Sequence, residues 1–240
     1  MRKALLVAAS FSLATLAGAQ TAKDAQPASN VLQAHTDADV VQPSEVTTYV
    51  TPTIISQDTF AGTTTMVVDI AGTDSWDLLG DSDNIVLTVP LTTGDMMTGI
   101  GWDVTLMTVG GSWLSEARFY FDGSDQDLSG LFLTPGVGLS TPGTSFFSSG
   151  GIVDLTDNGI PDIPILADGT LYIEVHETFD DVADAVDSTW IAPSTLTLAL
   201  DLAAPAVPTV NQWGLIILTV LLFAGIVWRS VRRKSAPNAG

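Results

Sequence analysis

The stretch with the most definite chemistry is residues 154–162, where oxygen-bearing side chains recur at set intervals. Counted from the first aspartate, they stand at positions 1, 3, 5 and 9, and a glycine, Gly159, stands at position 6. The four residues are Asp154, Thr156, Asn158 and Asp162. Calcium loops use this spacing because side-chain oxygens suit a hard cation and glycine permits the sharp turn. The pattern therefore predicts calcium as the cofactor of this loop.

A plain turn is the alternative for the same residues, because Asp, Asn and Gly tolerate a positive φ. Position 12 of the loop is Ile165, whereas an EF-hand carries a bidentate glutamate there. The flanking residues also alternate as in strands. The loop is thus not an EF-hand, and the sequence leaves open a short calcium loop and a simple turn.

Two further groups of ionisable residues are candidates for binding. An acidic cluster around Trp76 contains Asp74, Asp77, Asp81 and Asp83; we expect a solvated loop there, with an ion or sugar site as the alternative. Glu174 and His176 share one face of a predicted strand and are close enough to hold a metal together. We expect instead that this pair lies on a solvent-facing edge.

Residue types for catalysis are sparse in this chain. It has no cysteine, and it contains neither a glycine-rich phosphate loop nor a Ser-His-Asp set with a nucleophile elbow. Paired carboxylates for glycoside hydrolysis are an alternative, because 27 Asp and Glu supply many chance pairs. We expect a protein that is not an enzyme and has no catalytic residues, with a polysaccharide hydrolase as an alternative.

The charge is distributed very unevenly, and the net charge is −19. All 27 Asp and Glu lie between Asp24 and Asp201, and of the eight Lys and Arg only Arg118 lies among them. Nucleic-acid binding depends on basic side chains that displace counterions from phosphates. The composition therefore excludes nucleic acid as a partner.

Residues 44–203 are expected to form the strands that position these groups. Apolar and polar residues alternate over short runs separated by Gly, Asp, Ser and Pro, as in half-buried strands. Residues 101–121 are expected to form a hairpin that turns at 109–112, and a last strand should place Leu196, Leu198, Leu200 and Leu202 inward. About eight to ten strands are expected. The prediction is an all-β fold with a single β-sandwich or jelly-roll-like domain.

The N-terminus has the three parts of a secretory signal peptide, predicted for residues 1–19. Basic Arg2 and Lys3 precede an apolar run at residues 4–16, and small residues, Ala17 and Ala19 among them, flank the expected cleavage site. Residues 20–43 are polar, without a sustained apolar period, and are predicted to be a flexible linker.

A second linker is predicted at 204–209, and an uncharged apolar segment follows at 210–228. At a rise of about 1.5 Å per residue, a helix of this length crosses the hydrocarbon layer. The segment is therefore predicted to be a C-terminal transmembrane helix. The basic tail, 229–240, is expected to stay cytoplasmic by the positive-inside rule, which places the acidic domain outside.

The C-terminal residues resemble the IPTL-CTERM sorting signal. Its usual form is Ile-Pro-Thr-Leu-Ser, one variable residue, Trp-Gly, an apolar helix and an arginine-rich end. The matching residues here are Val207, Pro208, Thr209, Val210, Asn211, Trp213 and Gly214, followed by Arg229, Arg232 and Arg233. Val207, Val210 and Asn211 depart from the usual form but keep its apolar or small polar character. The resemblance covers the tail alone.

This resemblance implies an exported Gram-negative protein whose tail is recognised and cut by a membrane sorting enzyme, with a plain membrane anchor as the alternative. We expect inner-membrane anchoring with the domain in the periplasm, or processing that delivers it to the cell surface or the medium. The domain is expected to serve as a non-enzymatic surface or matrix component. The alternative is a calcium-assisted module that binds extracellular polysaccharide or a surface protein.

Overall fold

The computed structural model describes residues 31–34, 45–60, 62–123, 130–182, 184–204 and 210–234. The predicted signal peptide, 1–19, with its cleavage site at Ala17 and Ala19, lies outside these residues, as do most of the predicted linkers at 20–43 and 204–209. The chain forms two compact units, one extending to Asp201 and the other beginning at Leu202.

The first unit contains two β-sheets, and the smaller has six strands. In order across this sheet they are β1 (Leu32–Ala34), β9 (Leu131–Leu133), β8 (Ala117–Asp122), β13 (Thr170–Glu177), β6 (Ile85–Pro90) and β2 (Thr48–Val50). Neighbours are antiparallel except β2 and β6, which run parallel. The position of β1 differs from the prediction, because this strand lies inside the segment expected to be a flexible linker. Its Leu32 pairs with Leu133 of β9.

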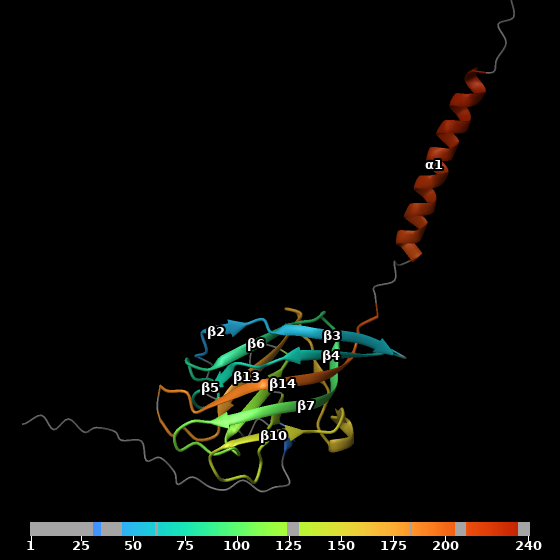
Figure 1. The fold of residues 1–240 in the computed structure, drawn as a ribbon. Coiled ribbons are helices and arrows are strands. Elements are labelled where there is room, and N and C mark those ends of the chain that lie inside the picture. The colour runs from blue at the N-terminus through green and yellow to red at the C-terminus, as the bar shows by residue number, and fades with distance from the viewer. Residues whose placement is uncertain are drawn as a thin grey trace, which may run out of the picture. The chain divides into compact units, whose positions relative to one another are not determined.

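The larger sheet has eight strands. Its main order is β10 (Thr144–Ser148), β7 (Met96–Thr108), β14 (Ser188–Asp201), β4 (Thr63–Asp69) and β3 (Thr53–Phe60). Short strands extend it, because β11 (Val153–Asp154) and β12 (Ile163–Pro164) pair with β7, and β5 (Thr73–Ser75) pairs with β14. Figure 1 shows β7, β14, β4 and β3 side by side. A short 3-10 helix, η1 (Thr156–Asn158), follows β11.

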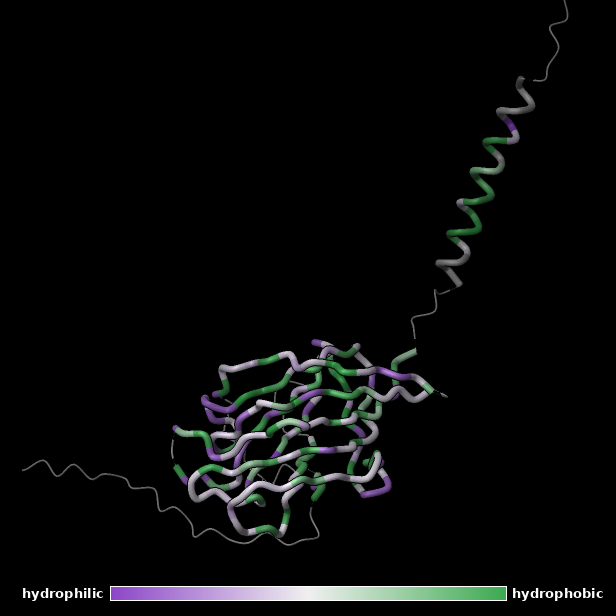
Figure 2. The backbone as a smooth tube through the Cα atoms, in the orientation of Figure 1, coloured by the Kyte–Doolittle hydropathy of each residue, from purple (hydrophilic) through white to green (hydrophobic). Residues whose placement is uncertain are grey.

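The alternation of residues explains which side chains are buried, because successive side chains of a strand point to opposite faces. In β4, Met66 and Val68 are buried, and in β14 Leu196, Leu198 and Leu200 are fully buried. Figure 2 shows hydrophobic and hydrophilic residues following one another along these strands. Buried side chains from both sheets join one hydrophobic cluster, as layered elements require. The structure confirms that the domain consists mostly of β-strands and that these form two sheets.

Two details of the predicted strands are wrong. Residues 101–121 do not form a hairpin, because β7 and β8 belong to different sheets. The turn after β7 is instead bonded to the chain before β14, where the Val109 amide donates to the Asp187 carbonyl at 2.7 Å. Leu202 does not continue the inward-facing row of β14. The strand ends at Asp201, and Leu202 is exposed.

The second unit contains one helix, α1 (Val210–Lys234). Figure 2 shows mainly hydrophobic residues along its middle turns, and the side chains of Leu215, Leu221 and Phe223 are exposed. Among the residues that the structure describes, no helix combines the length and the apolar character that a membrane crossing requires. A helix is therefore present where one was predicted, but the prediction that 210–228 spans a membrane is not confirmed.

Candidate cation sites

Two loops at one end of the domain bring acidic side chains together. One joins β5 to β6, and Asn84 holds it in place from its fully buried position. The Asn84 Oδ1 accepts from the Asp77 amide at 3.1 Å, and its Nδ2 donates to the Leu78 carbonyl at 2.7 Å and to Glu174 Oε1 at 2.8 Å. The Gly80 amide donates to the same Glu174 oxygen at 2.7 Å. The loop is thus tied to β13 through a buried carboxylate.

The other loop joins β13 to β14 and is tied to its surroundings through Asp187. The Asp187 amide donates to the Ser75 carbonyl at 2.9 Å, and its Oδ2 accepts from the Asp181 amide at 3.2 Å. Ser112 donates its hydroxyl to Asp181 Oδ2 at 3.0 Å. The described part of this loop contains no helical turn. Asp184 instead adopts a positive φ of 58°.

These two loops place three carboxylates at one point. Oxygens of Asp77, Asp83 and Asp184 all lie within 4.8 Å of one another. Asp83 and Asp184 are exposed, whereas Asp77 is only 6% exposed. The Oδ2 of Asp77 is buried and has no hydrogen-bond partner within the described part of the chain. Among the described residues, this is the one group of three or more His, Asp or Glu close enough to hold a metal ion.

The electrostatic state of Asp77 follows from this arrangement. Burial raises its pKa to about 6, and the nearby carboxylates of Asp180, Asp81, Asp184 and Asp187 act in the same direction. Each of these charges disfavours ionisation of Asp77. A cation in the cluster would reverse the effect and keep Asp77 ionised.

The loop predicted to bind calcium, residues 154–162, lies elsewhere, at β11 and η1. Asp154 Oδ1 accepts from the Thr156 hydroxyl at 2.7 Å and from the Asp157 amide at 3.0 Å. Both hydrogen bonds lower the pKa of Asp154, and the bond from the Asp157 amide has the larger effect. Asn158 Nδ2 donates to the Asp154 carbonyl at 2.8 Å, and Gly159 ends the turn with a φ of 73°. Asp154 and Thr156 thus already bond to each other within the turn.

Three of the four predicted ligands nonetheless line one pocket, of about 400 Å³. They are Asp154, Thr156 and Asp162, and Asp201 at the end of β14 joins them. The Oδ1 of Asp162 is buried, and none of the described residues forms a hydrogen bond with it. Burial, with the charges of Asp154 and Asp201, raises the pKa of Asp162. Asn158 is not among the lining residues, and calcium in this loop stays a prediction.

Glu174 and His176 are not on a solvent-facing edge as expected, because both are buried in β13. The sheet continues on both sides of this strand, with β6 and β8. His176 Nδ1 lies 2.9 Å from the Glu177 carbonyl oxygen, and its Nε2 is buried with no hydrogen-bond partner in the described part of the chain. Burial, and secondarily the charge of Arg118, lowers the pKa of His176 to about 3. The imidazole is therefore neutral and buried against the Phe132 ring.

Glu177 is the second buried ionisable group of β13. Its Oε1 accepts from the Ser188 hydroxyl at 2.7 Å, whereas its Oε2 is buried and has no hydrogen-bond partner among the residues that the structure describes. Burial raises its pKa to about 8. Its amide donates to the Asp77 carbonyl at 2.8 Å. This end of β13 therefore holds the backbone of one residue of the acidic cluster. Alternation along β13 places Glu177 on the same face as Leu171, Ile173 and Val175, and all four side chains are buried.

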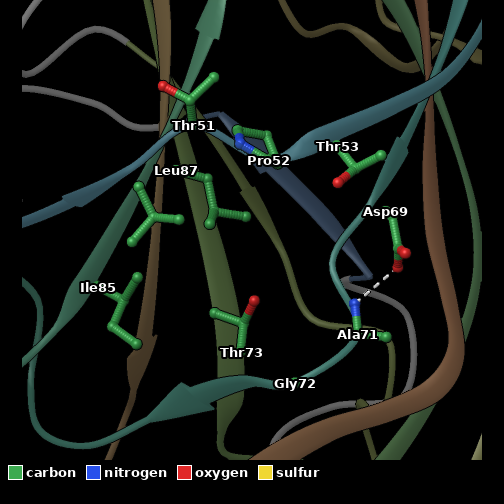
Figure 3. A pocket seen from close by; sticks show the side chains of 10 residues that line it. Thr51, Pro52, Thr53, Asp69, Ala71, Gly72, Thr73, Ile85 and Leu87 are labelled. Carbon is green, nitrogen blue, oxygen red and sulfur yellow. Dashed lines mark hydrogen bonds between the residues drawn. The ribbon is translucent and has the colours of Figure 1, made fainter.

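A further pocket, of about 260 Å³, lies where β2, β3 and β6 approach the 69–73 segment (Figure 3). Ile85 and Leu87 provide apolar surface, and Thr51, Thr53 and Asp69 provide polar groups. Asp69 Oδ1 accepts from the Ala71 amide at 2.9 Å, the hydrogen bond drawn in Figure 3. The pocket thus has one carboxylate, already engaged in the turn, and no sequence pattern predicted it.

The predicted sorting residues lie in and just before α1. Val207, Pro208 and Thr209 lie outside the described residues, whereas Val210, Asn211, Trp213 and Gly214 fall in the first turns of the helix and Arg229, Arg232 and Arg233 near its end.

Comparison with known protein families gives a match in this second unit. No curated protein and no solved structure matches the chain. The IPTL-CTERM motif matches residues 205–233, which confirms the resemblance inferred from Pro208, Trp213, Gly214 and the arginines. The tail of this protein is therefore an IPTL-CTERM motif, which marks the chain for export and for sorting at the membrane and the cell surface.

Proposed function

We propose that this protein is a non-enzymatic surface or matrix component whose β domain is displayed outside the cytoplasm. The observation that carries the proposal is the IPTL-CTERM motif at 205–233, placed directly after the compact unit that ends at Asp201. In this proposal a signal peptide directs export and the tail then holds the chain at the inner membrane, with the domain in the periplasm. Arg229, Arg232 and Arg233 favour a cytoplasmic end for the tail.

A membrane sorting enzyme then removes the tail and releases the domain to the cell surface or the medium. Plain anchoring, without cleavage, is the alternative. A structural role for the domain is supported by Glu174 and His176, since both are buried within β13 and engaged there. A high negative charge also suits a displayed protein, because it favours solubility.

Cell fractionation combined with the intact mass of the mature chain tests this proposal. The expected mature protein lacks residues 1–19 and everything after about Thr209, and it is recovered outside the inner membrane. A mature chain that keeps its tail in the inner membrane would contradict processing and favour plain anchoring. Recovery from the cytoplasm with residues 1–19 intact would contradict export itself.

A pair of variants makes the test specific to the motif. Trp213→Ala changes a residue that matches the usual form of the signal, whereas Gln212→Ala changes the neighbouring position, which varies in that form. We expect Trp213→Ala to accumulate with its tail attached and Gln212→Ala to be processed like the unaltered chain. Equal processing of both variants would show that the motif residues do not direct it.

A calcium-assisted module that binds polysaccharide or a surface protein is the second candidate. The pocket lined by Asp154, Thr156, Asp162 and Asp201 favours it, since Asp162 Oδ1 there is buried and unbonded. A glycan array probed with calcium and with chelator tests the polysaccharide ligand, and titration calorimetry of Asp154→Ala and Asp162→Ala tests the ion. Absence of glycan binding in both conditions would remove that ligand, and unchanged heats would remove calcium from this loop.

A polysaccharide hydrolase would use the same pocket, because its carboxylates converge from two elements. Incubation of surface polysaccharides with the protein should release no reducing sugar under the proposed non-enzymatic role. Sugar release that disappears in Asp162→Asn would establish the hydrolase instead.

A further inference from the structure

Among the residues that the structure describes, no hydrogen bond or ion pair brings a cationic side chain to the acidic cluster of Asp77, Asp83 and Asp184. Arg118 is the only Lys or Arg between Asp24 and Asp201. It belongs to β8, where its Nε donates to Thr134 Oγ1 at 2.9 Å and its guanidinium lies 4.9 Å from the centre of the Phe132 ring. Three carboxylates within 4.8 Å repel one another unless protons or a cation compensate for their charge.

The second observation concerns Asp77 alone. Its side chain is 6% exposed, and its Oδ2 is buried without a hydrogen-bond partner among the described residues. Buried polar oxygens are normally hydrogen-bonded, and buried charges are paired or coordinate metals. Because a carboxylate oxygen of Asp77 lies within 4.8 Å of oxygens of Asp83 and Asp184, the unsatisfied group faces a place where a cation would be held.

We propose that Asp77, Asp83 and Asp184 bind one hard divalent cation, calcium, that joins the β5–β6 loop to the β13–β14 loop. The donor set consists only of oxygens, which excludes the soft metals that need sulfur or nitrogen. Calcium fits better than magnesium because irregular loops offer variable geometry, and backbone carbonyls and water complete its six to eight ligands. Neither the sorting motif nor the 154–162 loop takes part in this site.

The bound ion links the two loops in the folded state alone, because the unfolded chain does not bring Asp184 near Asp77. Calcium should therefore raise the thermal stability of the folded protein.

The test uses the full chain in detergent, freed of metal with a chelator and then titrated with calcium or magnesium chloride. At about 100 times the dissociation constant, calcium should raise the Tm by about 5–10 °C. Asp83→Asn and Asp184→Asn, at exposed positions that the fold does not require, should each weaken calcium binding at least about tenfold, as expected for loss of a charged ligand. Calorimetry measures the affinity directly.

Two controls separate this site from others. Asp58→Asn removes an exposed aspartate of β3 and should leave affinity and Tm shift unchanged. The double variant Asp154→Asn with Asp162→Asn should retain the calcium-dependent Tm shift. The proposal is overturned if calcium does not raise the Tm of the unaltered chain. It is equally overturned if Asp83→Asn and Asp184→Asn bind calcium as tightly as that chain, or if the 154/162 double variant abolishes the shift. None of these outcomes bears on the sorting of the tail.

Discussion

Phe119 of β8 and Trp190 of β14 stack with their ring centroids 4.4 Å apart, and the two residues belong to different sheets. Both side chains are fully buried. The rings therefore form a direct contact between the smaller and the larger sheet, in a core that has no disulfide to support it. Aromatic pairs at this separation contribute both buried area and favourable ring contact.

Removal of one ring of this pair should destabilise the protein strongly. We expect Trp190→Ala to lower the free energy of unfolding by about 3–5 kcal/mol, because it leaves a large cavity between the sheets. Urea denaturation followed by far-UV circular dichroism measures the change. Phe60→Ala is the control, since Phe60 is 87% exposed, and it should change stability by at most about 0.5 kcal/mol. Similar losses in the two variants would contradict a stabilising role for the inter-sheet stack.

Asn84 should be the most sensitive polar residue of the acidic end of the domain. It is fully buried, and its side chain makes three hydrogen bonds, to Asp77, Leu78 and Glu174. Asn84→Ala leaves those groups unsatisfied and should cost about 2–4 kcal/mol of stability. Asn158→Ala removes one exposed hydrogen bond, to the Asp154 carbonyl, and should cost at most about 1 kcal/mol. The prediction fails if thermal denaturation ranks the two variants in the opposite order.

His176 should make stability fall in mild acid. Its pKa is about 3 in the folded protein against an ordinary value of 6.5. Between these values the unfolded chain binds a proton that the native protein does not, so stability is lost as the pH falls through this window. The groups that face His176 are Arg118 on β8, the Phe132 ring and the Glu177 carbonyl.

The Glu177 carboxyl changes stability with pH in the opposite direction. Because its pKa is raised in the folded protein, stability is lost as the pH rises toward 8. A comparison of the unaltered chain with His176→Gln cancels that contribution, which both proteins share. We expect the slope of unfolding free energy against pH to differ by up to about 1.4 kcal/mol per unit between pH 6.5 and 4. Parallel curves over that range would show that His176 is not buried as a neutral ring.

Gly136 should not tolerate any side chain. A Cβ there would overlap the carbonyl oxygen of Leu114 and lie 3.3 Å from the ring of Phe147. Backbone cannot yield without disturbing its hydrogen bonds, so Gly136→Ala should destabilise the domain by at least about 2 kcal/mol. At Gly111 the nearest atom to an added Cβ is Asp181 Oδ1 at 3.5 Å, an ordinary contact. Gly111→Ala is the matched control, and equal Tm values for the two variants would refute the predicted clash.

The sequence alone determined those features that depend on neighbouring residues. The alternation in β4 and β14 predicted an all-β domain, because side-chain direction in a strand repeats every two residues. The IPTL-CTERM tail could be found from Pro208, Trp213, Gly214 and the arginines, because the motif is a contiguous pattern. The acidic loop around Trp76 was also visible, and it contains Asp77 and Asp83, two of the three clustered carboxylates.

Only the tertiary structure decided which distant segments meet. Residues 101–121 looked like a hairpin, yet β7 and β8 lie in different sheets, and the surroundings of buried His176 include Arg118 of β8 and the Phe132 ring of β9. Asp184 reaches Asp77 because β14, which follows its loop, pairs with β5, which precedes the other loop. Such pairing depends on the burial of side chains far apart in the chain, and local periodicity carries no record of it.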